Sequence, residues 1–134
     1  MLKMTDIRSW VAGLGLVDDA HTYMGKLDNK KQKSIGVYNR SRETPEDVAL
    51  GGRDATSCAT KSISILVHWN KSAAESEEAA QTLFQKLQSY DTNFTIGETD
   101  VFYLELQVQE PVDVGTDDSG VYEYVIWVDF IYRK

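Results

Sequence analysis

Residues 121–133 read VYEYVIWVDFIYR, a long segment in which every second side chain is apolar or aromatic. In a strand, alternate residues point to the same face. One face therefore carries a continuous apolar row, formed by Tyr122, Tyr124, Ile126, Val128, Phe130 and Tyr132. The other face mixes Val125, Trp127 and Ile131 with charged residues. This pattern predicts a strand that covers a core with one face and leaves a partly apolar second face.

Two helices and four further strands are predicted before this segment. Apolar residues recur at helical spacing over 4–13, with Thr5 as N-cap, and over 73–90. The second helix begins with Ser72 and Glu75 spaced as a capping box. Alternation predicts strands at 61–69 and 100–109, and a hairpin from 21–27 and 34–39 around the turn residues Asp28 and Asn29. We expect one domain over 1–134, of class α+β, with a mixed, largely antiparallel β-sheet and two helices packed on one face.

Two helices cover one face of such a sheet, so the second face needs a separate explanation. Tyr38, Leu66 and Tyr103 join Trp127 and Ile131 there if the strands align in register. Isolated exposed apolar residues are ordinary on protein surfaces, whereas a contiguous patch marks an interface. We expect a protein interface on this face.

Residues 41–60 carry no sustained periodicity and contain Pro45, Gly51 and Gly52. A connection of this length inside a domain is uncommon and is often functional or mobile. We interpret 41–60 as a long mobile loop that orders against a partner, with an ordinary surface excursion as the alternative.

The chain of 134 residues has a formal net charge of −7, which argues against a sequence-specific nucleic-acid binder. No apolar run is long enough to span a bilayer, and the first residues do not form a signal peptide. The single cysteine, Cys58, agrees with a reducing compartment. These features favour a protein of the cytoplasm.

The charge is unevenly divided along the chain. Residues 1–71 hold 11 basic and 8 acidic residues, a balance of +3, whereas residues 72–134 hold 3 and 13, a balance of −10. The charges either interleave on one solvated surface or form two unlike flanks suited to head-to-tail association. For the second case the candidate interface residues are Arg40, Arg42, Arg53, Asp113, Asp117, Asp118, Trp127 and Ile131.

No pattern of catalytic or metal-binding residues is recognisable. His21 and His68 lack metal-ligand spacing, and we expect His68 to face solvent on the polar side of its strand. Cys58 has no nucleophile context, and no glycine pair forms a phosphate loop. We therefore expect no enzyme, no catalytic residue, no bound metal and no cofactor.

Several segments resemble the minor capsid or tail terminator proteins of long-tailed bacteriophages. The likeness lies in TYMGKL at 22–27, SIGVYN at 34–39, LGG at 50–52, LVHWN at 66–70 and PVDVGTD at 111–117. It extends over about 7–133, and its motifs are structural.

This resemblance implies a structural virion component that assembles in the host cytoplasm. Such proteins form a ring, usually a hexamer, on the head-proximal end of the tail tube. The ring stops tube polymerisation and docks to the head–tail connector proteins. A head-completion or neck adaptor, or a minor capsid component, is the nearest alternative; a bacterial peptide- or protein-binding module is a more distant one.

Overall fold

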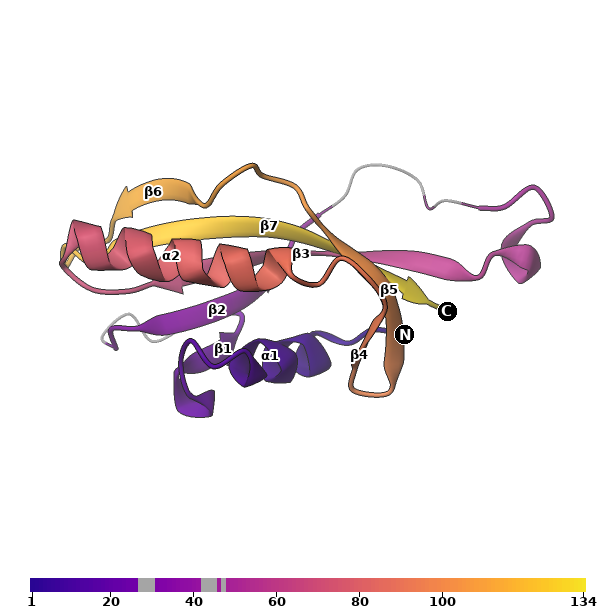
Figure 1. Ribbon diagram of the computed structural model, residues 1–134, viewed down its shortest axis with the longest axis horizontal. Coiled ribbons are helices and arrows are strands. Elements are labelled where there is room, and N and C mark those ends of the chain that lie inside the picture. Colours follow the sequence, from indigo (N-terminus) through magenta and orange to yellow (C-terminus); the bar gives the residue numbers. More distant parts are fainter. Residues whose placement is uncertain (27–30, 42–45, 47) are drawn as a thin grey trace.

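The computed structural model describes residues 1–26, 31–41, 46 and 48–134. Its elements are α1 (Met4–Gly13), η1 (Asp19–His21), β1 (Thr22–Met24), β2 (Ser34–Asn39), η2 (Arg53–Ala55), β3 (Cys58–His68), α2 (Ala73–Gln88), β4 (Phe94–Ile96), β5 (Thr99–Leu106), β6 (Val112–Thr116) and β7 (Tyr122–Arg133). Within the described residues the sheet has seven strands in the order β1-β2-β3-β7-β5-β4, with β6 also paired to β7. The fold is α+β, as predicted, and both helices lie on one face of a curled sheet (Figure 1).

The strand at 121–133 is the centre of this sheet. β7 pairs antiparallel with β3 from the pair Cys58–Arg133 to the pair His68–Glu123. Its other edge is shared, because β6 pairs with its first half and β5 with its second half. The apolar row predicted for β7 faces the helices, and Ile126, Val128 and Phe130 are fully buried there.

The helix α2 follows its predicted start closely. The Ser72 hydroxyl accepts a hydrogen bond from the Glu75 backbone N–H at 3.3 Å. The Glu75 carboxylate accepts from the Asn70 side-chain amide at 2.9 Å, and Asn70 Oδ1 accepts from the Ser72 N–H at 2.9 Å. Asn70 thus bridges the two halves of the predicted capping box. In α1 the N-cap is Lys3 without a side-chain bond, so the predicted cap at Thr5 is wrong.

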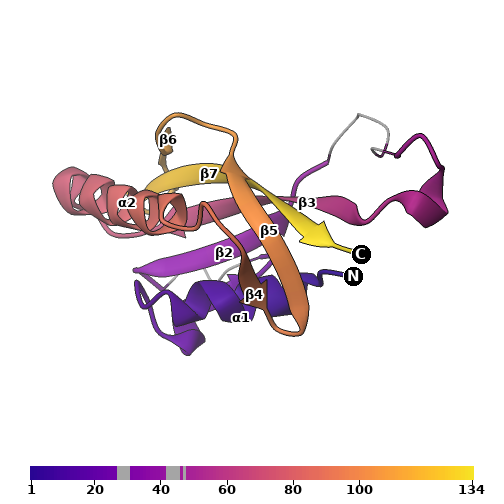
Figure 2. The same ribbon diagram turned by 45° about the vertical axis from the view of Figure 1, so that its right-hand side comes forward.

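An aromatic cluster joins the two helices to the sheet. The Trp10 ring lies 5.0 Å from Tyr90, 5.4 Å from Phe94 and 5.7 Å from Phe130, measured between ring centroids. Aromatic pairs at these separations add to the free energy of apolar burial. Phe94 brings the β4–β5 hairpin into this cluster, and the hairpin curls over towards α1 (Figure 2).

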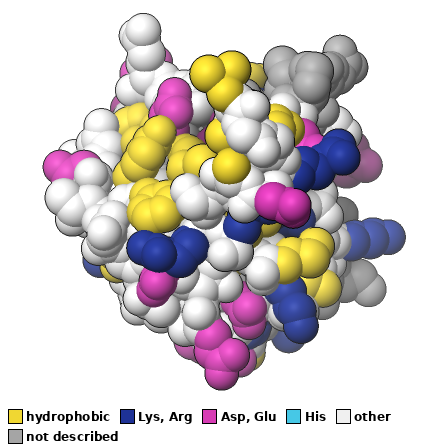
Figure 3. Space-filling model, turned by 90° about the vertical axis from the view of Figure 1, so that its right-hand side faces the viewer, with side chains coloured by type: hydrophobic (Ala, Val, Ile, Leu, Met, Phe, Trp, Pro, Cys, Tyr) yellow, Lys and Arg dark blue, Asp and Glu magenta, His cyan; other side chains and the backbone are white. Residues whose placement is uncertain are grey.

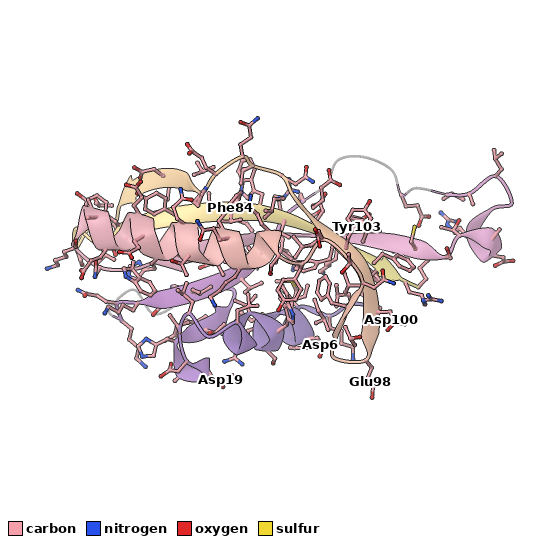
Figure 4. The ribbon with its side chains drawn as sticks, viewed as in Figure 1. Asp6, Asp19, Phe84, Glu98, Asp100 and Tyr103 are labelled. Carbon is pink, nitrogen blue, oxygen red and sulfur yellow. The ribbon has the colours of Figure 1, made fainter. Side chains whose placement is uncertain are left out.

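The β4–β5 turn has little space where it meets α1. Gly97 has a φ of +59°, and a Cβ at this position would lie 3.2 Å from the Asp6 Cγ. Glu98 follows Gly97 in this turn (Figure 4), and the Asp100 carboxylate on β5 lies 3.6 Å from Arg133 Nε. The backbone conformation therefore favours glycine at position 97, and a Cβ there would also require the Asp6 carboxylate to shift.

The predicted hairpin at 21–39 is wrong. β1 and β2 pair in parallel, with Thr22 beside Ile35 and Met24 beside Val37. In a parallel pair the chain must return along the first strand before the second begins, and residues 25–33 connect Met24 to Ser34. The turn residues Asp28 and Asn29 lie outside the described residues.

Candidate functional site

The sheet face opposite the helices carries a band of apolar and aromatic side chains. The register places Tyr38 beside Ser64 and Ser64 beside Trp127. Leu66 lies beside Val125, and Tyr103 lies beside Ile131. The predicted alignment of Tyr38, Leu66 and Tyr103 with the β7 residues is therefore confirmed. Trp127 is 39% exposed and Tyr103 is 42% exposed, so the band is open to contact.

Arg40 lies across this band. Its Nη2 is 2.7 Å from Asp129 Oδ1, and its guanidinium lies 5.7 Å from the centroid of the Trp127 ring. The Asp129 side chain is only 8% exposed and the Arg40 side chain 26%. Among the described residues, the Arg40 Nε and the Ser62 hydroxyl are buried without a hydrogen-bond partner. Arg40 thus forms an ion pair with the nearly buried Asp129 carboxylate, and it makes a cation–π contact with the exposed Trp127 ring.

His68 is fully buried, so its predicted exposure to solvent is wrong. Its Nδ1 lies 3.0 Å from Glu123 Oε2, and its Nε2 lies 3.8 Å from Asp117 Oδ2. Glu123 is the register partner of His68 on β7, and Asp117 comes from the turn after β6. The imidazole therefore ties this turn to the central pair of strands.

Asp117 organises the turn between β6 and β7. Its Oδ1 accepts hydrogen bonds from the backbone N–H groups of Ser119 at 2.9 Å and Val121 at 3.0 Å. The Val121 N–H is the largest cause that holds the pKa of Asp117 below its ordinary value; the Ser119 N–H and the nearby His68 act in the same direction, against the effect of burial. The carboxylate form is thus part of the folded turn.

A groove of about 400 Å³ runs between α2 and β6. Its lining residues are Glu77, Gln81, Glu110, Pro111, Val112, Asp113 and Tyr124. Burial raises the pKa of the Tyr124 phenol, and the nearby Asp113 and Glu77 carboxylates raise it further. The groove therefore combines an apolar floor with a negative rim.

Within the part of the chain that the structure describes, no group of three or more His, Cys, Asp or Glu residues is arranged to hold a metal ion. The described residues also include no helix of the length and apolarity that a membrane span requires.

A family model for bacteriophage tail terminator proteins matches residues 10–133. The chain belongs to this family. The match covers all the strands of the sheet and the end of α1, and membership gives the protein a structural role in phage tails. No curated protein matches the chain.

The predicted interface residues of this tail terminator family member fall into three places. Arg40, Trp127 and Ile131 lie on the open face, where Arg40 and Trp127 touch. Asp113, Asp117 and Asp118 gather on β6 and the turn that follows it. Arg53 lies apart in η2, where it pairs with the exposed Glu46 at 2.5 Å. Arg42 lies outside the described residues. Their roles at an interface stay predictions.

Two features of the site were not predicted from the sequence. The acidic groove depends on β6, whose five residues are all exposed and whose one alternation, Val112 and Val114 around Asp113, is too short to predict a strand. β3 begins at Cys58, inside the segment predicted as a loop, and the β-branched Thr60 is the signal that indicated a strand there.

Replacing Arg40 by alanine is expected to lower the free energy of unfolding by about 2 kcal/mol, because the nearly buried Asp129 carboxylate loses its ion pair with the Arg40 guanidinium. Urea unfolding at neutral pH measures the change. The matched control is Arg53→Ala, which removes an arginine–carboxylate pair that is exposed on both sides and should leave the unfolding midpoint almost unchanged. Equal effects of the two changes would contradict this account of Arg40.

The depressed pKa of Asp117 predicts a pH dependence of stability. The stabilisation is present above the ordinary pKa of about 4 and is lost as pH falls through the lower pKa of the folded state. Asp117→Asn removes the charge, so the gap in urea midpoint between wild type and variant should be large at neutral pH and should narrow with acidification. Asp118→Asn, in the same turn, is the control. A gap that stays constant with pH would refute the assignment.

Proposed function

We propose that this protein is the tail terminator itself: a ring, most simply a hexamer, on the head-proximal end of the tail tube. The ring stops tube polymerisation and offers the docking surface for the head–tail connector proteins. Family membership supports this role over that of a head-completion adaptor or a minor capsid component.

The observation that carries the proposal is that the two ends of the molecule differ in chemistry. Asp113, Asp117 and Asp118 lie at the β6 end, and the start of β3 with Arg53 lies at the other end of the long axis (Figure 1). A closed ring needs a heterologous interface, in which one patch meets a different patch on the next copy. Two unlike ends on one chain meet this requirement.

The open sheet face supports the second half of the role, which is docking to other virion proteins. Trp127 and Tyr103 give this face the aromatic content of protein interfaces, and the partly buried Ile131 lies beside Tyr103. It lies on the side of the sheet away from both helices, and so it stays available when the ends of the molecule are engaged by neighbouring copies.

The test is electron microscopy of growing tail tubes with and without the protein. A ring on one tube end, together with an arrest of tube growth, is the expected result. Trp127→Ser should reduce the joining of heads to capped tubes at least tenfold without unfolding the protein, because large interface aromatics carry much of the binding energy. Gln85→Ser, an exposed position on α2, is the matched control.

Binding only to isolated heads would show a neck adaptor instead. Binding to neither tubes nor heads would contradict a role in the virion neck and would favour a protein-binding module of another kind.

A further inference from the structure

The first residues of β3 form an open strand edge. β2 pairs with β3 only from Ile63 to His68, and the Arg40 N–H extends this pairing by one bond to the Ser62 carbonyl at 3.2 Å. Backbone groups alternate in direction along a strand, so Thr60 and Cys58 turn their N–H and C=O groups to the same side as Ser62. No described residue pairs with β3 on that side of Cys58 and Thr60.

A second open edge lies at the opposite end of the molecule. β6 pairs with β7 along one side, and no described strand pairs with its outer side. All five β6 residues are exposed. The start of β3 and the whole of β6 lie at opposite ends of the long axis in both ribbon views (Figures 1 and 2). An unpaired edge of this kind is a template for a strand of another chain.

Lys61 on β3 and the groove beside β6 are opposite in charge. Lys61 follows Thr60, whereas Arg133 and Lys134 adjoin the other side of β3, which β7 occupies; Figure 3 looks onto this end, where basic and acidic side chains are both set among hydrophobic ones. Glu77, Glu110 and Asp113 line the groove beside β6. An opposite charge on the two sides of a contact helps to fix its register.

The charged side chains of the two strands also lie on the same face of the sheet. A strand added to a sheet keeps its side chains on the same two faces as its neighbours. Lys61 stands opposite Phe130 and Asp113 stands opposite Tyr124, which places both on the face that the helices cover. A shared sheet would therefore bring Lys61 to the groove side of β6, where the carboxylates lie.

We infer that the β3 edge of one copy, at Cys58–Thr60, pairs with the outer edge of β6 in a second copy beside the acidic groove. This inference rests on the proposed ring and names its subunit contact. The β-sheet then continues from one copy to the next around the ring. A pairing of so few residues is weak between two copies and gains strength when the ring closes, because each copy is then held on both sides.

Cysteine cross-linking tests this contact directly, because Cys58 is the only cysteine in the chain and lies on the inferred edge. Val112→Cys and Val114→Cys, introduced one at a time, place a second thiol on exposed positions of β6. Paired residues on neighbouring strands lie within the Cα separation that a disulfide accepts. Oxidation, both in concentrated solution and on tail tubes, should convert the variants into a ladder of oligomers that ends at the ring.

Three controls separate this contact from random oxidation. Wild type, with one thiol, should stop at dimers, and so should Val112→Cys combined with Cys58→Ser. Gln85→Cys, which places the second thiol on the exposed side of α2, should give at least tenfold fewer oligomers above the dimer.

The outcomes distinguish this contact from the proposed function. Rings on tube ends without a cross-linked ladder would overturn the β3–β6 contact and leave the terminator role intact. A ladder from a protein that does not cap tubes would support the contact and contradict the terminator role. If neither a cross-linked ladder nor rings on tube ends form, the β3–β6 contact and the terminator role are both overturned.

Discussion

The pairing of β3 with β7 is the constraint on which the rest of the structure depends. The two strands are in register from Cys58–Arg133 to His68–Glu123, and they are far apart in the sequence. Because β7 is longer than any one neighbour on its other edge, β5 and β6 divide that edge between them. The same length leaves the start of β3 beyond the reach of β2. One long ladder therefore creates the core, the open face and both free edges.

The elements with strong periodicity could be predicted from the sequence, and the short ones could not. β7 and α2 are long enough for alternation and helical spacing to identify their buried faces, and the core residues Ile126, Leu83 and Leu87 follow from them. β4 has three residues, and β6 has one short alternation, Val112 and Val114, so neither is long enough to predict a strand. The parallel pairing of β1 and β2 depends on the path of the chain between them, and local turn residues do not report it.

In the candidate site, too, some features could be predicted from the sequence and others could not. The apolar band on the open face was predictable, because Trp127, Tyr103 and Leu66 each sit at the right parity of a recognisable strand. The burial of His68 was not, because it comes from Glu123 and Asp117, which reach the imidazole only through the β3–β7 register and the turn after β6. A polar residue on a strand is buried when distant carboxylates converge on it, and single-strand parity cannot reveal this.

Amide hydrogen exchange, compared between the free protein and the protein bound to tail tubes, tests most directly the claim that this chain works through its strand edges. The central amides of β3 and β7 should exchange slowly in both states, because their ladder is complete within one copy. The amides of Thr60 and Cys58, and those on the outer side of β6, should gain at least tenfold protection only on assembly. Unchanged exchange at both edges, with protection appearing instead on the exposed side of α2, would contradict the account.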